Sequence, residues 1–199
     1  EVKEFDASPY FNDRDQKRYS RNIQYAVSAA SDAVKNSGLN VDSLDKSRAG
    51  VILASGMGGM DVYYDTSATL SNKGPRRVSP FFIPMAITNM AAGEVSIRFG
   101  FMGPNFTTTS ACASSNHALI AAADQIRLGR ADVMLAGGSE ESVSYVSLGG
   151  FANMHALSRR NDAPQEASRP FDKARDGFVI GEGAAIMVLE SRSHAEKRG

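Results

Sequence analysis

Residues 107–138, TTTSACASSNHALIAAADQIRLGRADVMLAGG, predict a strand, a helix and a second strand in immediate succession. Residues 107–110 favour a strand because threonine is β-branched. Residues 113–128 are mostly Ala, Leu and Ile, and residues 132–138 are a short apolar run that ends in glycine, as a buried strand often does. The helix is apolar around most of its circumference, so we expect it to be covered on most sides and to be central in the molecule.

The flanking sequence continues this alternation of strands and helices. The expected elements are a helix that starts with a capping box at 13–16 and ends at Gly38, a strand at 49–54, helices at 61–72 and 85–98, a strand at 105–110, and strands at 177–180 and 184–190. Such alternation predicts an α/β fold with a mostly parallel or mixed sheet.

The composition is that of a globular protein. Of the 199 residues, 42% are hydrophobic and 22% are charged, which excludes a disordered or collagen-like chain. Lys and Arg total 22, as do Asp and Glu, so the net charge gives no reason to expect nucleic acid or an anionic membrane as a partner. No apolar run is long enough to span a bilayer. We interpret the chain as a piece of a longer polypeptide, because it begins without Met and stops just after a helix predicted from Ser193.

Cys112 is the only cysteine, so no disulfide can form within the chain, and a reducing compartment is the simpler expectation. It lies where the predicted strand meets the predicted helix. The first N–H groups of a helix have no partners within the helix, and the helix dipole is positive there, so this position favours a thiolate and offers donors to an oxyanion. The placement is analogous to the nucleophile elbow of serine hydrolases. The alternative is a small buried core residue, and no catalytic base can be identified from spacing.

The segment around Cys112, residues 109–115, resembles the active-site segment of the β-ketoacyl-acyl-carrier-protein synthases of the thiolase-like superfamily. Other segments that agree in order and spacing are residues 55–59, 80–84, 102–105, 131–138, 149–151 and 168–183. The resemblance is closest to the type I/II elongating synthases of bacteria and plastids. It implies a thiolase-like layered α-β-α-β-α fold, of which residues 1–199 would be the N-terminal half, with the first strand and the C-terminal half absent.

The resemblance also implies a mechanism. An acyl group would pass from the phosphopantetheine thiol of acyl carrier protein to Cys112, and decarboxylation of malonyl-carrier protein would then give a carbanion that attacks the thioester. The Cys112 N–H would be one oxyanion donor. The two catalytic histidines and the lysine of the family belong to its second half, and none of His117, His155 and His194 lies in a catalytic-histidine motif, so we expect the chain alone to be inactive.

The remaining implications concern substrates and partners. No cofactor is implied, since the substrates are carried on phosphopantetheine, and the protein is expected to be a homodimer in the bacterial cytoplasm or the plastid stroma. Met57, Ile87 and Phe151 match positions that border the acyl pocket, with core packing as the alternative. The residues proposed to dock acyl carrier protein are Arg14, Lys17, Arg18, Arg76 and Arg77, and the alternative for them is a solvated surface neutralised by Asp13 and Asp15.

Several other residues favour structural roles. His117 lies about 140° around the helix from Cys112 and is expected to be a packed or hydrogen-bonded histidine rather than the base. Residues 56–59 lack the spacing of a nucleotide-binding loop, and no histidine has a partner at metal-ligand spacing, so no metal site is expected. The charged residues expected to brace one loop as an ion-pair network are Asp172, Arg175, Asp176 and Glu182.

Two competing functions remain open. One is a polyketide ketosynthase. The other is a non-catalytic partner similar to the chain-length factors, against which the presence of Cys112 argues.

Overall fold

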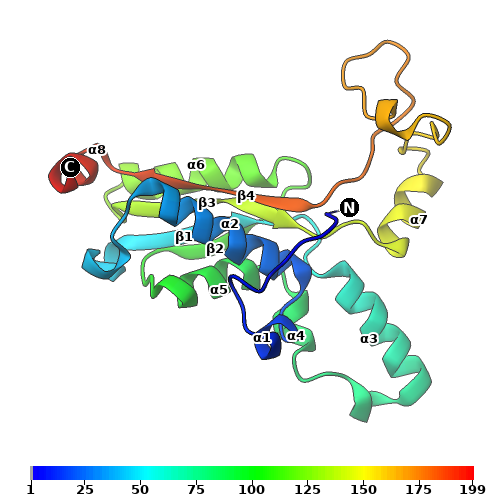
Figure 1. Ribbon diagram of the computed structural model, residues 1–199, viewed down its shortest axis with the longest axis horizontal. Helices are drawn as coiled ribbons and strands as arrows, with labels where there is room; N and C mark the ends of the chain where they lie inside the picture. The colour runs from blue at the N-terminus through cyan, green and yellow to red at the C-terminus, as the bar shows by residue number, and fades with distance from the viewer. Residues whose placement is uncertain (1) are drawn as a thin grey trace.

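The computed structural model describes residues 2–199, which form a four-stranded sheet with helices on both faces (Figure 1). The strands lie in the order β2 (Asn105–Thr108), β1 (Ala49–Ala54), β3 (Val133–Glu140) and β4 (Gly183–Glu190). β1 runs parallel to β2 and β3, whereas β4 runs antiparallel to β3. The predicted α/β fold with a mixed sheet is confirmed.

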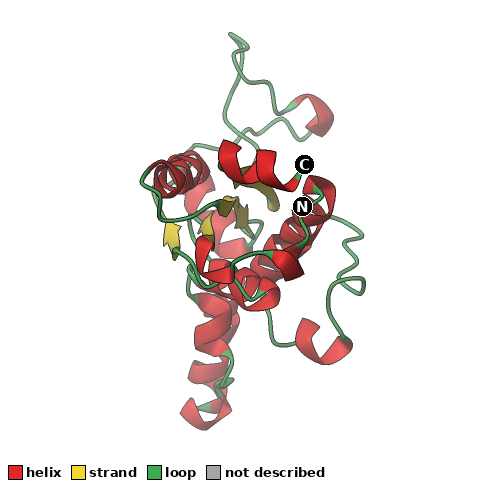
Figure 2. Cartoon of the chain, turned by 90° about the vertical axis from the view of Figure 1, so that its left-hand side faces the viewer, coloured by secondary structure: helices red, strands yellow, loops and turns green. Residues whose placement is uncertain are grey.

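The two central strands are buried because helices cover both of their faces. All six residues of β1 are buried, which explains why its sequence, AGVILA, is apolar throughout rather than alternating. On one face, α2 (Arg21–Ser37) and α5 (Met90–Phe99) pack against Val51 and Leu53. On the other face, α6 (Ser114–Arg127) packs against Ile52. Figure 2 shows the strands between these helices.

The other elements lie around this sheet. They are α1 (Asp13–Gln16), α3 (Met60–Lys73), α4 (Phe82–Ala86), α7 (Tyr145–Asn153), α8 (Arg192–Arg198) and the 3₁₀ helices η1 (Val41–Ser43), η2 (Lys46–Arg48), η3 (Pro75–Arg77) and η4 (Pro164–Glu166). α3 and α7 project away from the sheet at the end where β1 and β3 finish (Figure 1). Within residues 2–199, no helix is both long enough and apolar enough to cross a membrane.

Three predicted elements differ from the structure. The first predicted helix is divided into α1 and α2, because the chain is extended at Ser20 before α2 begins. The helix predicted at 85–98 is likewise divided into α4 and α5, with Ile87 extended between them. The strand predicted at 177–180 does not form, and Phe178 makes only an isolated bridge with Leu157.

The expectation that α6 is covered on most sides is wrong for this chain. Only one side of α6 packs against the sheet, through Ala118 and Ala122. On the other side of the helix, Ile120 is 57% exposed. Leu128, directly after the last residue of α6, is 64% exposed. Apolar residues around the whole circumference of α6 therefore do not all pack against residues of this chain.

Candidate functional site

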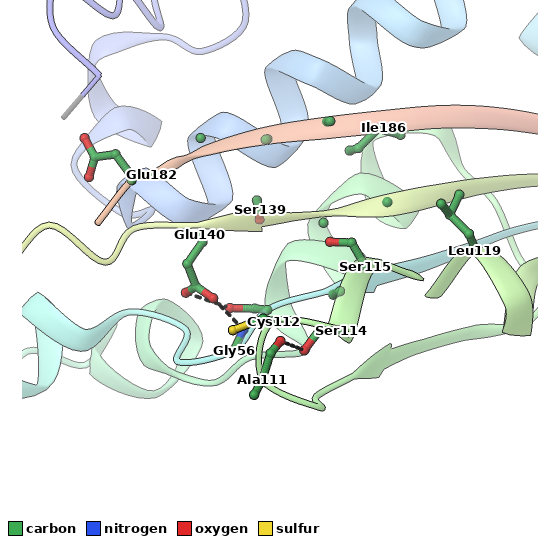
Figure 3. Close-up of a pocket in the computed structure, with 18 of the residues that line it drawn as sticks. Gly56, Ala111, Cys112, Ser114, Ser115, Leu119, Ser139, Glu140, Glu182 and Ile186 are labelled. Carbon is green, nitrogen blue, oxygen red and sulfur yellow. Dashed lines mark hydrogen bonds between the residues drawn. The ribbon is translucent and has the colours of Figure 1, made fainter. Parts of the chain in front are cut away.

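Cys112 lies in a hollow of about 650 Å³ at the carboxyl ends of β1 and β3 (Figure 3). The carboxyl edge of the parallel strands is where ligand sites form in open α/β sheets. The residues that line the hollow are residues 54–56 at the end of β1 and after it, Ala111 and Cys112, residues 137–140 of β3, residues 181 and 182 before β4, residues 183–187 of β4, and Ser114, Ser115 and Leu119 of α6. Cys112 is exposed, so the alternative of a buried core cysteine is wrong for this chain.

The backbone that carries Cys112 is fixed by one buried serine. Cys112 lies two residues before the start of α6, as predicted, and Ala111 before it has a φ of 51°, in the left-handed region that non-glycine residues seldom adopt. The Ser114 hydroxyl accepts a hydrogen bond from the Ser110 N–H at 2.8 Å and donates one to the Ala111 carbonyl at 2.6 Å. Ser114 therefore ties the two residues that precede Cys112 to the start of α6, across the bend that places the thiol.

Beside Cys112, the hollow is lined by Ser55 and Gly56, which begin a glycine loop, residues 55–59, that follows β1. Gly58 has a φ of 68°, and a Cβ there would lie 2.8 Å from the Ala86 carbonyl oxygen, so both the backbone conformation and the space require glycine. The Ser55 hydroxyl accepts a hydrogen bond from the Gly58 N–H at 2.9 Å. The loop is thus closed on itself and packed against α4.

Two adjacent glutamates at the end of β3 hold different parts of the molecule. Successive side chains of a strand point to opposite faces. Glu140 points to the face of Cys112 and accepts hydrogen bonds from the glycine loop, as Figure 3 shows for Gly56. Glu141 points to the face of α2 and accepts a hydrogen bond from the Asn22 N–H at 3.1 Å. The Ser20 side chain makes no capping bond to α2, so Glu141 caps this helix from a distant part of the chain.

The environment of Glu141 is acidic as well as buried. Burial raises the pKa of Glu141, the Asn22 N–H opposes this, and the nearby carboxylates of Asp61 and Glu182 raise it further. Sequence reasoning missed both Glu140 and Glu141. The sequence pattern that could have identified them is a pair of acidic residues just after an apolar strand, because the carboxyl end of that strand was expected near the site.

The three predicted acyl-pocket residues do not line the hollow that contains Cys112. Met57 lies in the glycine loop with its N–H directed at Glu140. Ile87 follows α4, and Phe151 on α7 packs edge-on against Phe178 with the ring centroids 5.2 Å apart. Of these, only Met57 is in a segment that reaches the hollow, and the predicted contact of all three with substrate stays a prediction.

The predicted docking residues come from two segments. Arg14 lies in α1, and Lys17 and Arg18 are the first two residues after this helix. Arg76 and Arg77 lie in η3. Lys17 and Arg77 line one shallow hollow of about 280 Å³ between these segments. Arg18 stacks over the Phe81 ring, with Cζ 5.1 Å from the ring centroid, and lies 3.8 Å from Asp15. The structure therefore brings at least part of this basic set together, with one of its charges partly neutralised.

None of the three histidines lines the hollow of Cys112. His117 is exposed, and its Nδ1 lies 2.5 Å from the Ser110 hydroxyl, so it is hydrogen-bonded but not packed in a core. His155 and His194 have Arg159 and Glu190 as partners. In the part of the chain that the structure describes, no three His, Cys, Asp or Glu side chains are grouped as metal ligands would be.

The predicted ion-pair network is divided between two places. Asp176 accepts hydrogen bonds from Ser158 and from Arg169, which was not among the predicted residues, and Arg175 donates one to the Asp172 backbone carbonyl. These contacts lie within the loop, but among the described residues no two of the four predicted ones form an ion pair. Glu182 is not part of that group. It accepts hydrogen bonds from the Val2 N–H at 2.7 Å and the Tyr25 hydroxyl at 3.3 Å, and so ties the N-terminal segment to α2.

Comparison with known proteins gives the family of this chain. Residues 1–195 match the family described as Beta-ketoacyl synthase, N-terminal domain. The chain is 47% identical over 202 residues to 3-oxoacyl-[acyl-carrier-protein] synthase I, chloroplastic, of Arabidopsis thaliana, a match that covers 100% of this chain and 43% of that protein. The chain thus spans less than half the length of this relative.

Two solved structures are similar in fold. A beta-ketoacyl synthase from Burkholderia phymatum STM815 gives a TM-score of 0.90 at 33% identity, over 100% of this chain and 48% of that one. A structure of a type II PKS acyl-carrier protein in complex with its ketosynthase gives a TM-score of 0.83 at 27% identity, over 100% of this chain and 55% of that one. These ketosynthases have the thiolase-like fold that the resemblance implied.

Proposed function

The chain belongs to the beta-ketoacyl synthase family, and on this premise we propose that the complete protein is a 3-oxoacyl-[acyl-carrier-protein] synthase in which Cys112 is the nucleophile. The observation that carries the proposal is the exposed thiol of Cys112, held just before α6 in a hollow at the carboxyl ends of parallel strands. An exposed thiol in an open hollow can meet a substrate that a carrier presents from outside.

The first step would be acyl transfer. The Cys112 sulfur attacks the carbonyl carbon of the acyl thioester, the carbon–sulfur bond to the carrier breaks, and the carrier leaves as a free thiol. The positive end of α6 begins two residues after Cys112, where its N–H groups would stabilise the oxyanion of the tetrahedral intermediate. Small neighbours, Ala111 and Ala113, leave room for the acyl group.

The second step would be decarboxylative condensation. Malonyl-carrier protein loses carbon dioxide, its carbanion attacks the acyl carbon on Cys112, and the Cys112 thiolate leaves to give a 3-oxoacyl product two carbons longer. We propose that the histidines and the lysine that assist this step are in the part of the protein beyond these 199 residues. The chain alone would then accept an acyl group without condensing it.

The proposed partner is acyl carrier protein. A similar ketosynthase is solved in complex with such a carrier. Lys17 and Arg77 both line one shallow hollow of this chain, where their charges would attract an acidic surface. We also propose a homodimer that needs no cofactor, placed in the bacterial cytoplasm or the plastid stroma.

Two observations favour this function over the alternatives. The identity is 47% to the chloroplast synthase but 27% to a chain of the polyketide synthase complex, which favours fatty acid elongation over polyketide synthesis. The exposed Cys112 argues against a non-catalytic partner subunit.

Mass spectrometry of the complete protein after incubation with acyl-carrier protein tests the proposal. We expect the acyl mass on the peptide that contains Cys112 and no acylation of the Cys112→Ala variant. A second variant, Cys112→Ser, nearly keeps the size of the side chain and replaces the thiol by a less nucleophilic hydroxyl, so its acylation should be slower than that of the parent protein. Acylation at another residue, or condensation activity that survives Cys112→Ala, would contradict the assignment.

A further inference from the structure

We propose that Glu140 is a positioning residue, which fixes the glycine loop and thereby sets the size of acyl group that the hollow accepts beside Cys112. The inference rests on the proposed function for its substrate, an acyl thioester, but its geometry is independent of it. Glu140, Gly56 and Cys112 line the same hollow, and they lie side by side in Figure 3.

The Glu140 carboxylate collects several donors from the glycine loop. Its oxygens accept hydrogen bonds from the Gly56 N–H at 2.5 Å, from the Met57 N–H at 3.3 Å and 3.4 Å, and from the Ser55 hydroxyl at 3.2 Å. Two successive backbone N–H groups that converge on one anion form a nest, and hydrogen bonds to an ionised acceptor are stronger than those to a neutral one. Glu140 is therefore the carboxylate that fixes the start of the loop, at residues 55–57, beside the contacts that Gly58 and Thr109 make with Ser55.

The close approach of Glu140 to Gly56 makes the arrangement specific. A Cβ at position 56 would lie 2.9 Å from the Glu140 oxygen, so a side chain there would displace the carboxylate. Because Gly56 is itself part of the wall of the hollow, a shift of the carboxylate would move the wall.

The neighbouring glutamate, the first residue after β3, points to the other face of the sheet and offers a control. Glu141 is buried and caps α2, and it is not among the residues that line the hollow of Cys112. Glu141→Gln and Glu140→Gln make the same chemical change at adjacent positions. An effect that follows Glu140 alone is therefore an effect of the hollow and not of the end of β3 as a whole.

The experiment uses the complete protein with the variants Glu140→Ala, Glu140→Gln and Glu141→Gln. The rate of Cys112 alkylation is measured with two probes, N-ethylmaleimide and N-dodecylmaleimide, and kcat/KM for acyl transfer is measured with short-chain and long-chain acyl-carrier proteins. Each assay gives a ratio: the alkylation rate with the long probe over that with the short probe, and kcat/KM with the long-chain over that with the short-chain acyl-carrier protein. For Glu140→Ala we expect both ratios to change by at least about fivefold, which is the scale of losing charged hydrogen bonds. Glu140→Gln keeps one acceptor oxygen and should give a smaller change in the same direction.

The control, Glu141→Gln, should keep both the alkylation ratio and the kcat/KM ratio within about twofold of those of the parent protein. Unchanged ratios in both Glu140 variants, or an equal change in Glu141→Gln, would overturn the proposal. Failure of the unmodified protein to acylate Cys112 would refute the proposed function, and the alkylation ratio would still decide the role of Glu140. If Glu140→Ala does not fold, Glu140→Gln provides the same test.

Discussion

The side-chain hydroxyl of Thr109 donates a hydrogen bond of 2.9 Å to the backbone carbonyl oxygen of Ser55. This bond joins the segment that precedes Cys112 to the glycine loop that follows β1, although 54 residues separate the two positions. Both walls of the hollow are therefore linked directly, and the link can be tested.

Thr109→Val should lower the free energy of unfolding by about 1 kcal/mol, because valine keeps the β-branched shape and loses the hydroxyl. Urea denaturation of the complete protein measures the change. Thr107→Val is the matched control: its hydroxyl oxygen is buried with no partner among residues 2–199, so replacement should be neutral or stabilising. Equal losses in the two variants would show that the Thr109 bond contributes nothing of its own.

Ser114→Ala should cost about 1–3 kcal/mol of stability and slow the alkylation of Cys112 by iodoacetamide, because the bend through Ala111 loses two hydrogen bonds. The alkylation rate separates a displaced thiol from a general loss of stability. Ser28→Ala serves as the control, since the buried hydroxyl of Ser28 has no partner within the described chain. An alkylation rate that Ser114→Ala leaves unaltered would show that the thiol is placed by other contacts.

Glu141 should make the protein less stable as the pH rises. Burial raises the pKa of Glu141, so the folded state binds its proton more tightly than the unfolded state does. The stability that this proton gives is fully present below the ordinary pKa of 4.5 and is lost as the pH rises through the raised folded value. Relative to the parent protein, Glu141→Gln should therefore become more stable as the pH is raised from about 4 to about 7. Urea denaturation at both pH values gives the comparison, and a constant difference would contradict the raised pKa.

Reversal of the basic pair, Arg76→Glu with Arg77→Glu, should raise KM for acyl-carrier protein about fivefold or more at low salt and leave kcat unchanged, because the pair would act in docking. The effect should shrink as salt screens the charges. Arg127→Glu is the control, since Arg127 is an exposed arginine at the end of α6 paired with Asp124. An unchanged KM, or the same rise in the control, would remove the pair from the docking surface.

The sequence predicted the strands of the sheet better than the helices around them. The strand at 49–54 was predicted with the observed bounds, because an uninterrupted apolar run between glycine and polar residues fits few other structures. The placement of Cys112 before α6 was also predicted, since β-branched residues give way there to helix formers. The division between α4 and α5 was not, because apolar residues continue through the extended residue Ile87.

The roles of Glu140 and Ser114 lay beyond the reach of sequence reasoning for a physical reason. Glu140 acts on residues 83 to 85 positions earlier, so its partners become evident only when β1 and β3 are side by side. The partners of Ser114 are close in sequence, but its hydroxyl reaches them only through the left-handed backbone of Ala111. Serine and glutamate at these positions would otherwise fit any exposed strand end or helix start.

The opposite directions of Glu140 and Glu141 have a consequence for how this family can change. A strand with different tasks on its two faces cannot gain or lose one residue near its end, because the shift would turn each glutamate to the other's face. The glycine loop and the first turn of α2 would lose their carboxylates in the same event. We therefore expect natural length variation to be excluded from the end of β3 and to collect in the loops beyond it, where no such two-sided register has to be kept.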